Sequence, residues 1–133
     1  MLAIVTAAHN ECSYCLTAHS VAARGLGITE PEVLAAQSHR SPDPRREAMR
    51  GFAASLLESR GHVSDELLQA MADNGFAGNA LVDIVSVVVE NCLGNFINNL
   101  AQTEIDGAIL RAAERVGPEA VTAGGVPRNR GGR

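Results

Sequence analysis

Aromatic side chains are scarce in this sequence of 133 residues, which has no tryptophan, one tyrosine and three phenylalanines. A hydrophobic core must therefore be assembled mainly from alanine, valine, leucine and isoleucine, which favours closely packed helices. The hydrophobic content of 46% is enough to build such a core in a chain of this length. We therefore expect a single all-α domain.

Basic residues are also few, and acidic residues outnumber them. Eleven basic and fifteen acidic residues give a net charge of −4, which offers no electrostatic surface for nucleic acid or for an anionic membrane. The apolar start lacks the basic region of a signal peptide, and acidic residues and asparagines interrupt the longest apolar stretch, 81–100. We therefore expect a cytoplasmic protein with no nucleic-acid partner and no membrane span.

Apolar periodicity and turn residues predict the organisation of the chain. The expected helices cover 2–23, a short segment opened by a capping box of Thr29 and Glu32, 49–60, 64–75, 79–102 and 106–116. Residues 1–116 should form the domain, and the glycine- and arginine-rich residues 117–133 a disordered tail. The helix at 79–102 is apolar over most of its circumference, so it should be either the central core helix or part of a subunit interface.

Three residues near the start carry the chemistry: Cys12, Cys15 and His19. On one helix they share a face, and the i, i+3 spacing of the two cysteines suits a disulfide. The i, i+4 spacing lets His19 accept a proton from Cys15, whose thiolate is the reactive form. A helix starting near Leu2 leaves this activation to His19 alone, whereas a new helix capped by Asn10 adds the helix dipole.

Other interpretations of these residues compete with redox chemistry. A zinc site needs a fourth ligand, such as Cys92 or another histidine, and one compact helix seldom presents three ligands tetrahedrally. Haem attachment is excluded because Leu16 stands where a histidine is required. The two cysteines could also be small buried apolar residues beside a satisfied histidine. We expect neither a metal nor a cofactor.

The run Cys12-Ser13-Tyr14-Cys15-Leu16-Thr17-Ala18-His19 resembles the CxxCxxxH signature of the AhpD-like, carboxymuconolactone decarboxylase family. Downstream segments also resemble the family, at 25–30, 60–65, 74–76 and 94–106. The resemblance implies an AhpD-like helical bundle, a homo-oligomer (dimer, trimer or hexamer) and reduction of a hydroperoxide. In the family scheme Cys15 attacks the peroxide, Cys12 resolves the sulfenic acid as a disulfide, and a lipoyl-bearing or thioredoxin-like dithiol protein reopens it.

The chain departs from the family pattern at its start. The family's glutamate before the first cysteine, and the N-terminal helices that carry it, would fall ahead of Met1. Among possible substitutes, Glu11 points away from Cys12 and His9 lies nearer that face, while Glu90 could be brought in by the long helix. Further residues with lesser expected roles are Asn91, Asn95 and Asn98 as a polar stripe along the site or an interface, Tyr14 in packing, and Cys92 in the core.

The leading hypothesis is therefore a dithiol peroxidase with Cys15 as nucleophile, Cys12 as resolving thiol and His19 as base. A lactone decarboxylase, like the family's other branch, would not need the CxxC pair. A non-enzymatic alternative is a redox-sensing or inactive oligomeric member of the family, which would react once with an oxidant and not turn over.

Overall fold

The computed structural model describes residues 1–38 and 41–116, and within these ranges every regular element is a helix. The helices are α1 (Leu2–His9), α2 (Ser13–Gly25), α3 (Glu30–Gln37), α4 (Pro44–Glu58), α5 (Asp65–Asp73), α6 (Asn79–Ala101) and α7 (Gly107–Val116). The predicted all-α fold is confirmed. Helices α5, α6 and α7 lie within two residues of their predicted bounds, whereas α4 begins at Pro44 and not at residue 49, because Asp43 caps it and a proline is tolerated in the first turn. The predicted disordered tail, 117–133, is outside the described residues.

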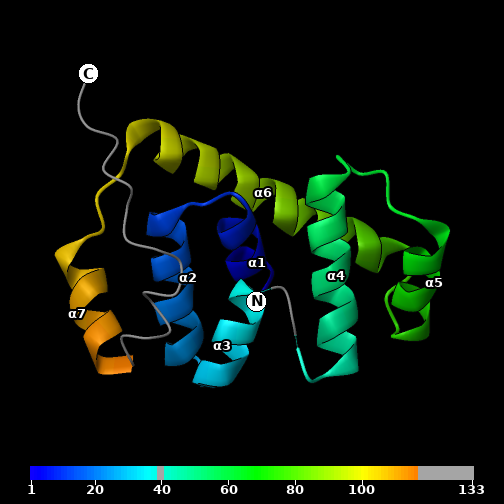
Figure 1. The fold of residues 1–133 in the computed structure, drawn as a ribbon, viewed down its shortest axis with the longest axis horizontal. Coiled ribbons are helices and arrows are strands. Elements are labelled where there is room, and N and C mark those ends of the chain that lie inside the picture. Colours follow the sequence, from blue (N-terminus) through cyan, green and yellow to red (C-terminus); the bar gives the residue numbers. More distant parts are fainter. Residues whose placement is uncertain (39–40, 117–133) are drawn as a thin grey trace.

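Helix α1 lies at the centre of the molecule (Figure 1). Its sequence LAIVTAAH has no charged residue before His9, so every side of the helix tolerates burial. Ile4, Val5 and Ala7 are at most 1% exposed, and α1 contacts α2, α3, α4 and α6. Of the two places expected for the long helix, the central core is occupied by the short α1 instead, and a subunit interface stays a prediction.

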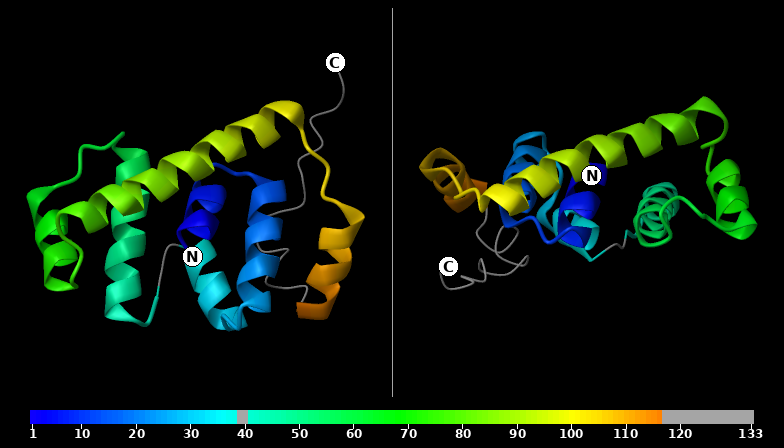
Figure 2. Two further views of the ribbon diagram at one scale, coloured as in Figure 1. Left: turned by 180° about the vertical axis from the view of Figure 1, so that it is seen from behind. Right: turned by 90° about the horizontal axis from the view of Figure 1, so that it is seen from above.

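Helix α6 crosses the ends of α1, α2 and α4 along one side of the molecule (Figures 1 and 2). It buries only Ile84, Val88 and Asn95. By length and composition α6 qualifies as a membrane span, although none was expected from the sequence, and a single helix of this kind is weak evidence of a membrane protein. Its large apolar side chains that are more than half exposed form what we call the outer face of α6: Val82, Val89, Leu93, Phe96, Ile97 and Leu100.

A turn separates α1 from α2, so the prediction of one continuous helix over 2–23 is wrong. Glu11 takes a left-handed conformation with φ of 52°. Its N–H bonds to the Ala8 carbonyl at 3.2 Å, and the Cys12 N–H bonds to the Ala7 carbonyl at 2.9 Å. This is the Schellman pattern of a helix end, built here without glycine. Cys12 is then extended and becomes the N-cap of α2.

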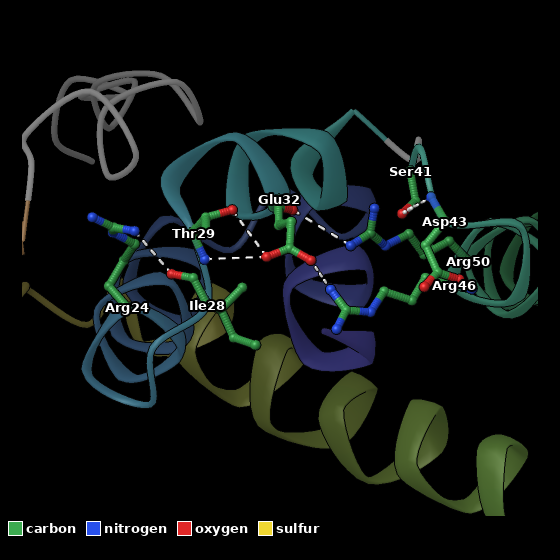
Figure 3. Close-up of polar contacts among 8 residues, drawn as sticks. All are labelled: Arg24, Ile28, Thr29, Glu32, Ser41, Asp43, Arg46 and Arg50. Carbon is green, nitrogen blue, oxygen red and sulfur yellow. Dashed lines mark hydrogen bonds and ion pairs between the residues drawn. The ribbon is translucent and has the colours of Figure 1, made fainter.

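Helices α3 and α4 are joined around Glu32, whose carboxylate accepts from the Thr29 backbone N–H at 3.2 Å (Figure 3). This contact fits the predicted capping box. The same carboxylate forms an ion pair with Arg46 of α4, and the buried Arg50 donates to the Glu32 carbonyl at 3.4 Å. These contacts hold α4 beside the central helix α1.

Candidate redox site

The two cysteines lie at the start of α2. Cys12 is the N-cap and Cys15 is the third helical residue, and the Cys15 backbone N–H donates to Cys12 Sγ at 3.3 Å. Both are free thiols, 1% and 6% exposed respectively. Because the positive end of a helix dipole acts within the first turn, α2 favours negative charge on both sulfur atoms. Of the two alternatives, a new helix that brings its dipole to the thiols is the correct one, although its N-cap is Cys12 and not Asn10.

Burial affects the protonation of Cys12. Burial and, second, the hydrogen bond with the Cys15 side chain together raise the pKa of Cys12 from 9.0 to about 12. Desolvation disfavours a thiolate more than a neutral thiol. Cys12 therefore keeps its proton at neutral pH.

An amide from α6 contacts the second thiol. The Asn98 side-chain Nδ2 donates to Cys15 Sγ at 3.3 Å and to the Gly94 carbonyl at 2.9 Å. The second bond fixes the orientation of the amide, so its other N–H points at the sulfur. A hydrogen-bond donor favours the charged form of the group that accepts the bond. Asn98 is thus placed to stabilise a Cys15 thiolate.

Two more asparagines of α6 hold the junction between α1 and α2. The Asn10 side chain donates to Asn95 Oδ1 at 3.0 Å and to Cys92 Sγ at 3.4 Å, and Asn99 donates to the Asn10 carbonyl at 2.8 Å. Asn95 is only 1% exposed, so it depends on this partner. Because Asn10 directly precedes the left-handed Glu11, these bonds position the turn that makes Cys12 a cap.

His19 lies one turn after Cys15 on the same helix and is half-buried. Burial lowers its pKa below 6.5, while a hydrogen bond with the Asn91 side chain acts in the opposite direction. At neutral pH the imidazole is therefore uncharged and can accept a proton. The predicted polar stripe of Asn91, Asn95 and Asn98 thus lines the site, each through a different contact.

The three possible substitutes for the family's upstream glutamate, Glu11, Glu90 and His9, lie in different surroundings. Glu11 and Glu90 are both exposed to solvent. His9 lines a pocket beside Cys92. In the part of the chain that the structure describes, no group of three or more histidine, cysteine or acidic residues is arranged to hold a metal.

Tyr14, expected only to pack, has a polar contact with the segment between α6 and α7. Its hydroxyl donates to Asp106 Oδ2 at 3.1 Å, and this bond raises the Tyr14 pKa. No local sequence pattern predicts the contact with Asp106, because 92 residues separate the two partners. The bond ties the middle of the CxxC segment to the far end of α6.

Residues 1–59 match the sequence model of the carboxymuconolactone decarboxylase family. This span contains Cys12, Cys15 and His19 and runs to the end of α4. No curated protein and no solved structure matches the chain. The resemblance expected from the sequence is therefore confirmed for this first part of the chain.

Proposed function

We propose, on the premise that residues 1–59 belong to the carboxymuconolactone decarboxylase family, that this protein is a thiol-dependent hydroperoxide reductase. The observation that carries the proposal is the pair of free thiols at the N-terminus of α2, with Cys15 Sγ hydrogen-bonded by Asn98. A helix N-terminus and an amide donor both favour the thiolate that attacks a peroxide. Cys15 is the nucleophile and Cys12 the resolving thiol.

The first step is attack by the Cys15 thiolate on the terminal oxygen of the hydroperoxide. A sulfur–oxygen bond forms, the oxygen–oxygen bond breaks, and the alkoxide takes a proton and leaves as an alcohol. Cys15 is oxidised to a sulfenic acid while the peroxide is reduced. His19 accepts the Cys15 proton beforehand and can return it to the leaving alkoxide.

His19 is suited to that exchange because its imidazole is uncharged at neutral pH. Burial lowers its pKa below 6.5, although the hydrogen bond with the Asn91 side chain acts in the opposite direction. An uncharged imidazole has one ring nitrogen without a proton, which can accept the thiol proton. The uncharged ring one turn after Cys15 is the main support for assigning His19 as the base.

The second step joins the two cysteines. Cys12 sulfur attacks the Cys15 sulfenic acid, a disulfide forms, the sulfur–oxygen bond breaks, and hydroxide leaves with the Cys12 proton as water. The raised pKa of Cys12 means that its proton leaves only during this attack. An external dithiol protein, lipoyl-bearing or thioredoxin-like, then reduces the disulfide by thiol–disulfide exchange.

We also propose that the protein forms a homo-oligomer in the cytoplasm through the outer face of α6. The six side chains of this face recur at helical spacing along one side of the helix and are each more than half exposed. Contiguous apolar surface of this kind marks protein–protein contacts in soluble proteins. A second copy would remove it from water.

The experiment that tests the peroxidase proposal measures dithiol oxidation with cumene hydroperoxide as oxidant and a lipoyl protein or dithiothreitol as reductant. We expect catalytic turnover in the wild type and none in Cys15→Ser. Turnover that survives Cys15→Ser would overturn the proposal. A single stoichiometric oxidation without turnover in the wild type would favour the redox-sensing alternative.

A further inference from the structure

One asparagine of α6 is buried at a position that would suit an apolar side chain. The buried residues of this helix are Ile84, Val88 and Asn95, and Asn95 is only 1% exposed. Burial of a side-chain amide is costly unless its polar groups are hydrogen-bonded, whereas a leucine at the same place would gain from burial. The buried amide therefore points to a role for its hydrogen bond rather than for packing.

That hydrogen bond joins α6 to the turn before the redox helix. Asn95 Oδ1 accepts from the Asn10 side-chain Nδ2 at 3.0 Å, and the same amide nitrogen also donates to Cys92 Sγ at 3.4 Å. Sulfur is a weak acceptor, so Asn95 is the main partner of the Asn10 side chain. Asn99 donates to the Asn10 carbonyl at 2.8 Å. Three contacts from α6 thus fix both the position and the orientation of Asn10.

The turn that follows Asn10 is not favoured by its own sequence. Glu11 adopts the left-handed conformation, with φ of 52°, which a residue with a β-carbon disfavours. Once the contacts to Asn10 are removed, the chain can relax towards the continuous helix that its apolar periodicity predicts. In such a helix Cys12 would be an interior residue and not the N-cap of α2. The bond between Asn10 and Asn95 opposes this rearrangement.

The N-cap position determines where the Cys12 sulfur lies. Cys12 is extended, with φ of −87° and ψ of 93°, and its Sγ accepts from the Cys15 backbone N–H at 3.3 Å. This contact holds the sulfur over the first turn of α2, close to the side chain that it attacks in the resolving step. Reactions between groups of one molecule depend steeply on placement, and a displacement of about 1 Å can cost roughly 100-fold in rate.

Different asparagines of α6 therefore hold the two thiols. Asn98 donates to Cys15 Sγ and to the Gly94 carbonyl, so it acts on the nucleophile. Asn95 acts on Cys12, through Asn10 and the turn. The two asparagines are three positions apart on one helix, and each can be substituted without the other.

We propose that Asn95 is a positioning residue for the resolving step: through Asn10 it keeps Cys12 at the N-cap of α2, within reach of the oxidised Cys15. The inference rests on the roles that the proposed function gives to the two cysteines. It adds that Asn95 governs the rate of disulfide formation and leaves the attack of Cys15 on an oxidant unchanged.

Methyl methanethiosulfonate separates the two steps without a peroxide. The Cys15 thiolate attacks the sulfur that carries the methyl group, methanesulfinate leaves, and a methyl disulfide of Cys15 forms. Cys12 then loses its proton, attacks Cys15 Sγ and displaces methanethiol, so the cysteine pair is oxidised by two electrons and the reagent is reduced. Mass spectrometry after acid quenching follows both species over time. A Cys92→Ser parent leaves these two cysteines as the only thiols.

The decisive variant is Asn95→Leu in this parent, because it removes the acceptor and keeps a side chain of similar size. We expect its second step to slow by about tenfold, so that the methyl disulfide accumulates, while the first step keeps the parent rate. Asn98→Ala, three positions further along α6, is the matched variant. It should give the reverse result, a slower first step and an unchanged second step, because it removes the donor to Cys15 Sγ.

Asn10→Ala tests the same interaction from its other side and guards against misfolding of Asn95→Leu. It removes the donor and should slow the second step by a similar factor. The double variant Asn10→Ala/Asn95→Leu should be no slower than either single variant, because all three lose one and the same interaction. Circular dichroism confirms that each variant is folded.

Two results would overturn the inference: an equal slowing of both steps in Asn95→Leu, or a second step that keeps the parent rate in both Asn95→Leu and Asn10→Ala. Neither result depends on peroxide turnover, so the inference can fail while the hydroperoxide reductase proposal stands. Conversely, the expected split between the two steps in a protein without peroxide turnover would remove the proposed function and keep the positioning role of Asn95.

Discussion

Residues 1–59 and residues 60–116 contribute differently to the redox site. The first part matches the carboxymuconolactone decarboxylase family and carries Cys12, Cys15 and His19. The second part lies outside that match, yet α6 supplies Asn98 to the Cys15 thiol and Asn91 to His19. The difference shows that a short local motif can supply the reactive groups, while their hydrogen-bond partners come from a helix far along the sequence.

The largest expected loss of activity follows from a substitution in residues 1–59, at the resolving cysteine Cys12. Cys12→Ser should abolish multiple turnover, a loss of roughly 10³-fold or more, because no disulfide can form. A single equivalent of peroxide should still oxidise Cys15. Mass spectrometry with a sulfenic-acid trap such as dimedone checks this, and a variant that keeps turning over would contradict the assignment of Cys12.

Burial of Cys12 should also be visible in its alkylation. Because its pKa rises from 9.0 to about 12, the folded protein keeps the protonated thiol over the pH range in which an unfolded chain ionises it. In a Cys15→Ser/Cys92→Ser background we expect iodoacetamide to react with Cys12 at pH 9 about 100-fold more slowly in the native state than in urea. Equal rates in both states would show that burial does not protect the thiol.

The contribution of the second part is tested at Asn98. Asn98→Ala removes the donor to Cys15 Sγ and should lower kcat/KM by roughly 10- to 100-fold, since one hydrogen bond to a charged group contributes roughly 1.5–3 kcal/mol. Asn79→Ala, at the exposed start of the same helix, is the matched control and should leave kcat/KM unchanged. A normal rate in Asn98→Ala would confine the site to the first 59 residues.

The outer face of α6 offers a test of assembly. Leu100→Asp should lower the molar mass measured by light scattering towards that of a single chain, because a charge would be buried in the interface. Leu26→Asp is the control, since Leu26 is 84% exposed and Leu100 is 88% exposed. If both variants keep the wild-type mass, the interface lies elsewhere.

The smallest effect is expected at the break between α1 and α2. Glu11→Gly should raise the free energy of unfolding by about 0.5–1 kcal/mol, because glycine adopts the left-handed conformation without a steric cost. Glu11→Ala should give no such gain. Chemical denaturation measures both, and a destabilised glycine variant would contradict the role of strain at this turn.

The predicted helices beyond residue 40 follow from signals that act over a few residues. Asp43 accepts from the Arg46 N–H at 3.0 Å at the start of α4, and Ser64 accepts from the Leu67 N–H at 3.4 Å at the start of α5. Such caps satisfy the free N–H groups of the first turn wherever the helix lies in the fold. The spacing of Cys12, Cys15 and His19 is a signal of the same short range, so their position on one helix could also be predicted from the sequence.

The sequence by itself therefore determined the helical class, most helix bounds and the identity of the reactive residues, because these depend on neighbours within about one turn. Only the tertiary structure decided that Glu11 breaks the first helix and makes Cys12 a cap, since bonds from Asn95 and Asn99 of α6 hold the preceding residue. It also decided which amide contacts Cys15, across 83 positions of the chain. No local pattern encodes a contact of that range, because it exists only once α6 has packed across α1 and α2.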